Sequence, residues 1–141
     1  MNRRLRVLLV EDHEADKRLV EEALSDCHIQ VDLDCAADGV EAIKYVKTIS
    51  EQTGAQKPDL IILDLNMPRK GGHEFLEEMH EFLKEEEIPV VLLTVSDTPE
   101  DINRAMDKRM NFFLSKPVNA NKLHQVLTAI NELWAPAACC H

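Results

Sequence analysis

The chain has 141 residues, of which 45% are hydrophobic, with only 4 Gly and 6 Pro, so its size and composition suit one compact domain. Its formal net charge of −10 argues against binding to nucleic acid or to an anionic membrane, because both require a basic face. The N-terminus lacks the pattern of a signal peptide and no apolar stretch approaches about 18 residues, so we expect a cytoplasmic protein.

The first apolar run, Arg6–Val10, predicts a buried strand that leads into the acidic pair Glu11 and Asp12. Apolar residues recur at helical spacing from Glu14 to Ser25 and predict the first helix.

The segment Val31–Ala36 alternates apolar and acidic residues, which is typical of a half-exposed edge strand. We expect a turn at Asp38–Gly39, a second helix that begins at Val40, and a polar loop from Ser50 to Lys57.

The run Leu60–Leu63 predicts a third strand, which leads into Asp64. The segment Pro68–Gly72 then breaks the chain before a third helix, whose outer face carries glutamates that we interpret as a solvated surface. The apolar face of that helix consists of Phe75, Leu76, Met79, Phe82 and Leu83.

Two further apolar runs predict strands: Val90–Leu93 leads into Thr94, and Phe112–Ser115 leads into Lys116. A helix between them should begin at Thr98, with a proline at its first position. A last helix is marked by Leu123, Val126, Leu127, Ile130 and Trp134.

Residues 135–141 should form a disordered tail, and the vicinal Cys139 and Cys140 lack the spacing of metal ligands. We expect Cys27 and Cys35 to be reduced and mostly buried, in keeping with a cytoplasmic protein.

Five strands that alternate with five helices predict a doubly wound parallel sheet in an α/β/α sandwich, formed by a single domain over residues 1–134. Such a sheet directs the carboxyl ends of all its strands to one edge, where ligands of open parallel sheets bind. The groups that should converge there are three carboxylates, a hydroxyl and an ammonium: Glu11, Asp12, Asp64, Thr94 and Lys116.

These groups suit a divalent cation and a phosphoryl group. Close carboxylates need a cation or protons, and Mg²⁺ prefers hard oxygen ligands. Asp64 could then attack phosphorus, while Lys116 and Thr94 stabilise the phosphoryl oxygens. Each residue alone has a simpler interpretation: Asp12, for example, could merely cap the first helix. The joint pattern carries the hypothesis, because the simpler interpretations do not require one shared edge.

The motifs at these positions resemble those of the receiver domain of bacterial response regulators, over about residues 5 to 134. They are Val10-Glu11-Asp12, Leu63-Asp64-Leu65-Asn66-Met67-Pro68, Leu93-Thr94 and Ser115-Lys116-Pro117. The resemblance implies a flavodoxin-like strand order of 2-1-3-4-5 and a phosphoryl group on Asp64. It also implies that Thr94 and Lys116 contact this group and that the Lys116–Pro117 peptide is cis. The magnesium ligands it implies are Glu11, Asp12, Asp64 and the backbone carbonyl of Asn66.

A narrower resemblance, in Asp64–Lys70 and Asn111–Pro117, is to stand-alone regulators paired with phytochrome kinases. It implies that the partners are a sensor histidine kinase of phytochrome type and a downstream protein target or phosphotransfer protein. Because Asn66 stands where a phosphatase would need an acid–base residue, we expect a switch that catalyses only its own phosphoryl transfer and slow dephosphorylation, rather than an enzyme.

The signal would leave the site through Thr94 and Phe113, which stands where many receivers have a tyrosine. Phe113 and Trp134 could form an apolar patch for a homodimer through the fourth helix, fifth strand and fifth helix, or they could be core residues.

Two other functions are weighed against the switch. A phosphatase of the haloacid dehalogenase type would need an acid–base Asp two residues after Asp64, but Asn66 stands there. A pseudo-receiver that serves only for docking would not need the intact set of Asp64, Thr94 and Lys116.

Overall fold

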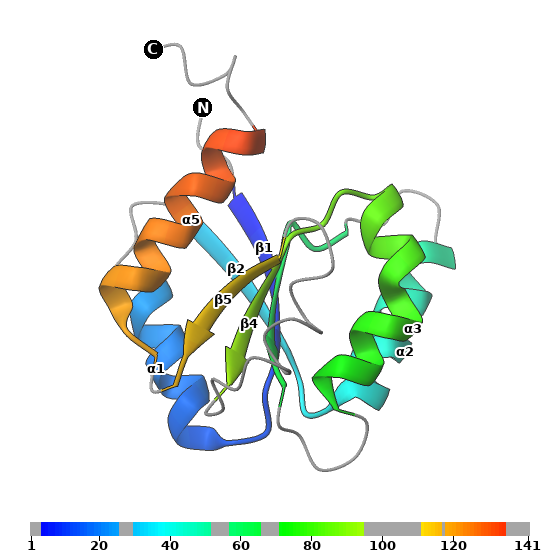
Figure 1. Ribbon diagram of the computed structural model, residues 1–141, viewed down its shortest axis with the longest axis horizontal. Helices are drawn as coiled ribbons and strands as arrows, with labels where there is room; N and C mark the ends of the chain where they lie inside the picture. Colours follow the sequence, from blue (N-terminus) through cyan, green and yellow to red (C-terminus); the bar gives the residue numbers. More distant parts are fainter. Residues whose placement is uncertain are drawn as a thin grey trace.

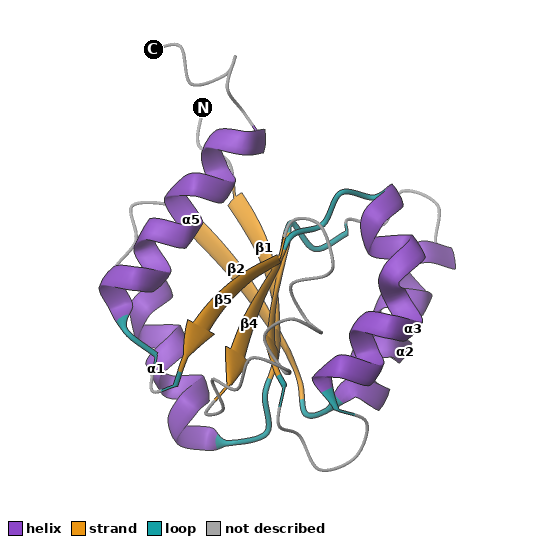
Figure 2. Ribbon diagram, in the orientation of Figure 1, coloured by secondary structure: helices purple, strands orange, loops and turns teal. Residues whose placement is uncertain are grey.

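The computed structural model describes residues 4–25, 30–51, 57–65, 71–94, 111–116 and 118–134, and strands and helices alternate along them up to residue 94 (Figure 2). The strands are β1 Arg4–Val10, β2 Gln30–Ala36, β3 Leu60–Asp64, β4 Val90–Thr94 and β5 Asn111–Ser115. The helices are α1 Glu14–Ser25, α2 Gly39–Glu51, α3 Gly72–Glu85 and α5 Ala120–Trp134. The helix expected to begin at Thr98 and the expected tail at 135–141 lie outside the described residues.

The five strands form one sheet in the order β2-β1-β3-β4-β5, and every neighbouring pair is parallel. This confirms the predicted doubly wound sheet and its 2-1-3-4-5 order. The central strands β3 and β4 are buried along their whole length, as expected for strands covered on both faces.

Helices cover both faces of the sheet: α1 and α5 lie on one face and α2 and α3 on the other (Figure 1). Side chains alternate between these faces along each strand. In β1, Leu8 and Val10 join the core beneath α2 and α3, whereas Val7 and Leu9 join the core beneath α1 and α5. The two cores fix the strand register, because a slip of one residue would exchange the faces.

The strand β2 lies at the edge of the sheet, as its alternating pattern predicts, and its burial is only partial. Three local expectations were wrong. The loop expected from Ser50 to Lys57 begins later, because α2 continues through Glu51. Cys35 is exposed rather than buried, because it lies on this thinly covered strand. The expected turn at Asp38–Gly39 is the start of α2: Gly39 is its first residue, and Asp38 Oδ1 accepts a hydrogen bond of 3.0 Å from the Glu41 N–H.

The glutamates on the outer face of α3 are exposed, as predicted, and the helix ends in a turn that places Glu87 at a φ of 55°. There the Ile88 N–H bonds to the Leu83 carbonyl at 3.0 Å and the Glu87 N–H bonds to the Lys84 carbonyl at 3.2 Å. This is the Schellman pattern, which usually has Gly at the left-handed position. Within the described part of the chain, no helix is long and apolar enough to cross a bilayer.

Candidate phosphorylation site

The carboxyl edge of the sheet collects the polar residues that the sequence places after its strands. Asp64 and Thr94 are the last residues of β3 and β4, and Glu11 and Lys116 directly follow β1 and β5. Backbone hydrogen bonds extend the pairing past the strand ends: the Glu11 N–H donates to Ala36 at 3.0 Å and the Lys116 N–H donates to Thr94 at 2.9 Å. These hydrogen bonds therefore keep the ends of neighbouring strands in register.

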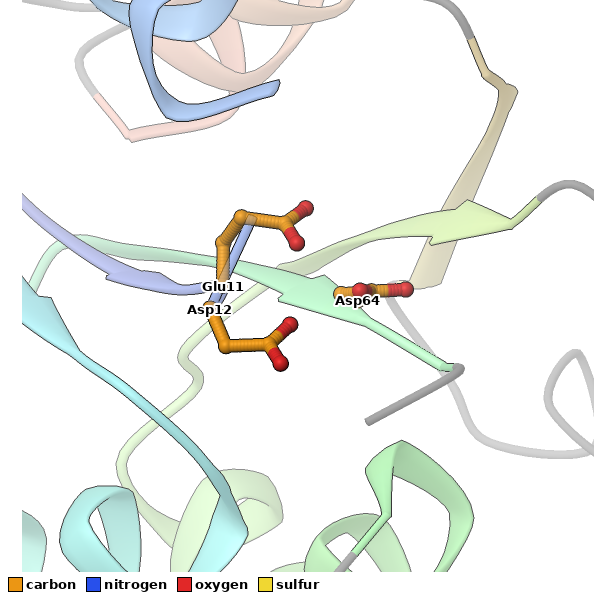
Figure 3. A group of neighbouring side chains, drawn as sticks. All are labelled: Glu11, Asp12 and Asp64. Carbon is orange, nitrogen blue, oxygen red and sulfur yellow. The ribbon is translucent and has the colours of Figure 1, made fainter. Parts of the chain in front are cut away.

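Three carboxylates form a compact group at this edge (Figure 3). Glu11 and Asp12 extend from the end of β1 and Asp64 from the end of β3, and one oxygen of each lies within 4.8 Å of the others. Glu11 is fully buried and Asp64 is 2% exposed, whereas Asp12 is open to solvent. Two of the three carboxylates are thus shielded from water. Like charges repel each other more strongly in such a buried environment than in solvent.

The group has the donor set and the spacing for Mg²⁺. Around an octahedral Mg²⁺, whose ligand oxygens lie about 2.1 Å from the ion, neighbouring ligand oxygens are about 3.0 Å apart and opposite ones about 4.2 Å apart. The three carboxylate oxygens lie within 4.8 Å of one another, which is close to this range. The exposed Asp12 also leaves one side open, which suits an ion that keeps several water ligands.

Lys116 places an ammonium inside the acidic group. Its Nζ lies 3.0 Å from Asp64 Oδ2, 3.0 Å from Glu11 Oε1 and 3.1 Å from Asp16 Oδ2, and its side chain is only 9% exposed. Burial lowers the pKa of Lys116, but its bonds to Asp64, Glu11 and Asp16 outweigh burial and leave the pKa above its usual value. The ammonium therefore stays charged throughout the physiological range.

Glu11 has a perturbed acidity. Burial, followed by the hydrogen bond to Asp64, raises its pKa from 4.5 to about 7, although Lys116 and the His13 backbone N–H act in the opposite direction. Its Oε1 forms the ion pair with Lys116 but receives no well-directed hydrogen bond from the described residues. A buried carboxylate oxygen without such a donor is the kind of group that a cation satisfies.

Two neighbours shape the surroundings of Asp64. Thr94, at the end of the adjacent strand β4, is buried with 1% of its surface exposed. Gly72, the first residue of α3, packs so closely that an added Cβ would lie 2.7 Å from the Leu65 Cα and 2.8 Å from the Asp64 carbonyl oxygen. Only glycine allows this approach of the helix to the strand end.

The structure joins most of the residues that the sequence nominates. Glu11, Asp12, Asp64 and Lys116 are brought together, and Thr94 lies on the strand beside Asp64. The Asn66 carbonyl and Pro117 lie outside the described residues.

Phe113, nominated as a switch residue, is half-buried against the core beneath α2 and α3, on the face opposite Phe112 and Leu114, as strand alternation predicts. The side chain of Trp134 lies outside the described part of the structure. The sequence reasoning missed Asp16, which faces Lys116 from the first turn of α1; its signal was an acidic residue in the turn that follows the acidic pair.

The sequence model of the family described as the response regulator receiver domain matches residues 7–128. The chain belongs to this family. This receiver domain is 36% identical over 128 residues to Response regulator Rcp1 of Synechocystis sp., covering 91% of this chain and 87% of that protein.

Solved structures of similar receivers agree with this assignment. The structure of the phosphorylated cyanobacterial phytochrome response regulator RcpA is 37% identical, with a TM-score of 0.75 and 94% of each chain covered. The Mn²⁺-bound form of Rcp1 is 34% identical, with a TM-score of 0.73, and the match covers 94% of this chain and 96% of that one. The family match thus places the chain with receivers rather than with haloacid dehalogenase phosphatases.

Proposed function

We propose that this receiver domain accepts a phosphoryl group on Asp64 from a sensor histidine kinase. The observation that carries the proposal is the position of Lys116 Nζ, 3.0 Å from Asp64 Oδ2, at an edge that also holds Glu11 and Asp12. A purely structural ion pair would need one carboxylate, whereas this edge concentrates several around one ammonium. The surplus negative charge suits a divalent cation.

In the transfer, an Asp64 carboxylate oxygen attacks phosphorus and forms a P–O bond, while the P–N bond of the kinase phosphohistidine breaks. The bond electrons leave with the imidazole, which can take a proton from solvent. Lys116 pairs with the phosphoryl oxygens and Thr94 donates a hydrogen bond to one of them. Magnesium, held by Glu11, Asp12, Asp64 and the Asn66 carbonyl, would offset the negative charge of Asp64 and the phosphoryl oxygens.

The domain acts as a switch in the cytoplasm and catalyses only its own phosphorylation and slow dephosphorylation. Similarity to RcpA, named as a cyanobacterial phytochrome response regulator, supports a phytochrome-type kinase as the phosphodonor. The output is contact with a protein target or a phosphotransfer protein. The net charge of −10 on the chain disfavours binding to DNA or to membranes. We assign this activity to residues 1–134 and no role to residues 135–141.

The signal leaves through Thr94 and Phe113. Phosphorylation draws the Thr94 hydroxyl toward Asp64, and Phe113 repacks on the neighbouring strand, which favours a homodimer through the fourth helix, β5 and α5. Light scattering should detect association that beryllofluoride, a phosphoryl mimic, strengthens and Phe113→Ala weakens. A protein that stays monomeric at about 100 μM in both states has no self-association stronger than about −5.5 kcal/mol, and the dimer would be rejected.

Phosphorylation itself is tested by intact-mass measurement after incubation with acetyl phosphate and Mg²⁺. We expect one base-labile phosphate on the wild-type protein and none on Asp64→Asn. Asp59→Asn is the matched control, because Asp59 precedes the same strand at the opposite edge of the sheet and should leave labelling intact. Equal labelling of Asp64→Asn would refute the assignment of Asp64, and an unlabelled wild-type protein would favour the pseudo-receiver alternative.

A further inference from the structure

Asp16 connects the first helix to the site. It lies in the first turn of α1, and its Oδ2 accepts a hydrogen bond of 3.1 Å from Lys116 Nζ, one hundred positions further along the chain. The side chain of Asp16 is 17% exposed, so this contact is mostly shielded from water. The same oxygen lies 3.2 Å from Nδ1 of the exposed His13.

The ammonium of Lys116 has three N–H donors, and three carboxylates lie within 3.1 Å of its Nζ. Two of them, Glu11 and Asp64, belong to the group that fits a cation, and Asp16 does not. Among the described carboxylates around Lys116, Asp16 is therefore the one that neither a cation nor a phosphoryl group requires.

We propose that Asp16 is a positioning residue, which anchors the Lys116 ammonium while Glu11 bonds to the cation and Asp64 becomes phosphorylated. The inference rests on the proposed function of Asp64. Lysine is a compact charge on a flexible stem, and holding it in one place has an entropic cost. One fixed bond to Asp16 would leave two N–H groups free to point at the phosphoryl oxygens.

An opposite effect of Asp16 must be weighed. Its negative charge also repels an anionic phosphodonor, so removal of the charge alone should speed phosphorylation. The anchor predicts the reverse, because an untethered Lys116 stabilises the phosphoryl oxygens less well. The sign of the change in rate therefore distinguishes the two roles.

The test measures the rate of labelling by acetyl phosphate at saturating Mg²⁺ in the full chain. We expect Asp16→Asn to slow labelling about tenfold, a change of about 1.4 kcal/mol in the barrier. Asp16→Glu keeps the charge one methylene further out and should recover part of the rate. The affinity for Mg²⁺, measured by calorimetry, should change less than about threefold, because Asp16 is a neighbour of the ion and not its ligand.

The matched control is Glu14→Gln, which removes the same charge from the same helical turn. Glu14 is exposed and pairs with Lys17 at 3.1 Å, so this variant should label at the wild-type rate. The second control uses Lys116→Met: in that background, Asp16→Asn should no longer slow labelling, since the anchor acts through the ammonium.

Three results would overturn the anchor while leaving Asp64 as phosphoacceptor: an unchanged or faster Asp16→Asn, an equal slowing by Glu14→Gln, or an undiminished effect in the Lys116→Met background. Absence of labelling in the wild-type protein would instead reject the proposed function and the anchor together. A melting temperature of Asp16→Asn close to that of the wild type verifies that the compared proteins are folded. If it is lowered, the Asp16→Glu rate decides: labelling of Asp16→Glu that is as slow as that of Asp16→Asn contradicts the anchor.

Discussion

Asp59 and Asp64 lie at the two ends of the buried strand β3, and their side chains have different partners. At the amino edge, Asp59 Oδ2 accepts a hydrogen bond of 2.9 Å from the Arg6 N–H, and the Asp59 N–H donates to the Arg6 carbonyl at 2.7 Å. At the carboxyl edge, Asp64 lies among carboxylates with one shared ammonium. Asp59 adds hydrogen bonds to the neighbouring strand, whereas Asp64 adds a negative charge to a group of carboxylates that folding alone does not require.

Residue type and strand position therefore do not by themselves identify a functional carboxylate. The partners do: Asp59 accepts a hydrogen bond from the backbone of the neighbouring strand, but Asp64 shares Lys116 with two other carboxylates. Each of the following predictions tests one side of this contrast between the two edges.

The largest effect on stability should come from the packing at the carboxyl edge. Gly72→Ala places a Cβ 2.7 Å from backbone, and we expect the free energy of unfolding to fall by about 1–3 kcal/mol. Gly71→Ala is the control, since Gly71 has a φ of −76° that alanine adopts readily. Urea unfolding measures both variants, and equal losses would contradict the close approach at Gly72.

The second effect concerns the cation. Mg²⁺ at one hundred times its dissociation constant should raise the stability of the wild type by about 2.7 kcal/mol. The double variant Glu11→Gln, Asp12→Asn should lose most of this gain and be as stable or more stable without Mg²⁺, since like charges are removed. Thermal melts with Mg²⁺ and with chelator test it, and a full Mg²⁺-induced rise in the double variant would exclude these residues as ligands.

The third effect is a dependence on pH without Mg²⁺. The pKa of Glu11 is about 7 in the fold against 4.5 for the ordinary group, so between these values the folded state holds a proton that the unfolded state has lost. Stability should therefore fall as the pH rises from 5 to 8, by on the order of 1–3 kcal/mol. Urea unfolding across this range should show a flatter profile for Glu11→Gln; an identical slope would assign the dependence to other groups.

The smallest effect lies in the turn that leads to the amino end of β4. Glu87 adopts a φ of 55°, which glycine tolerates without steric cost. Glu87→Gly should raise the free energy of unfolding by about 0.5–1 kcal/mol, because relief of the strain exceeds the added entropy of the unfolded chain. Glu81→Gly, at an exposed position in the interior of α3, should instead lower it by about 1 kcal/mol. A destabilised Glu87→Gly would show that the strain is negligible.

Much of the fold and the site could be predicted, because the strands follow from short apolar runs that are visible in the local sequence. A parallel sheet built from these runs brings Glu11, Asp64, Thr94 and Lys116 to one edge. What depends on three-dimensional neighbours could not be predicted. The exposure of Cys35 follows from the thin cover over β2, and the contact of Asp16 with Lys116 follows from how α1 meets the end of β5. The exposure of Cys35 has no signature in nearby sequence, and the acidic residue in the turn after Glu11 and Asp12 does not by itself indicate which side chain Asp16 contacts.

The contrast between the two aspartates is tested most directly by the free energies of unfolding of Asp64→Asn and Asp59→Asn, measured in urea at pH 8 without Mg²⁺, where Glu11 is ionised. We expect Asp64→Asn to be about 1 kcal/mol more stable than the wild type, because it relieves repulsion while Lys116 keeps Glu11 and Asp16. Asp59→Asn should be about 1 kcal/mol less stable, because a neutral amide is a weaker acceptor for the Arg6 N–H. A loss of stability in Asp64→Asn as large as that in Asp59→Asn would contradict the account, since it would make Asp64 a structural residue like its counterpart.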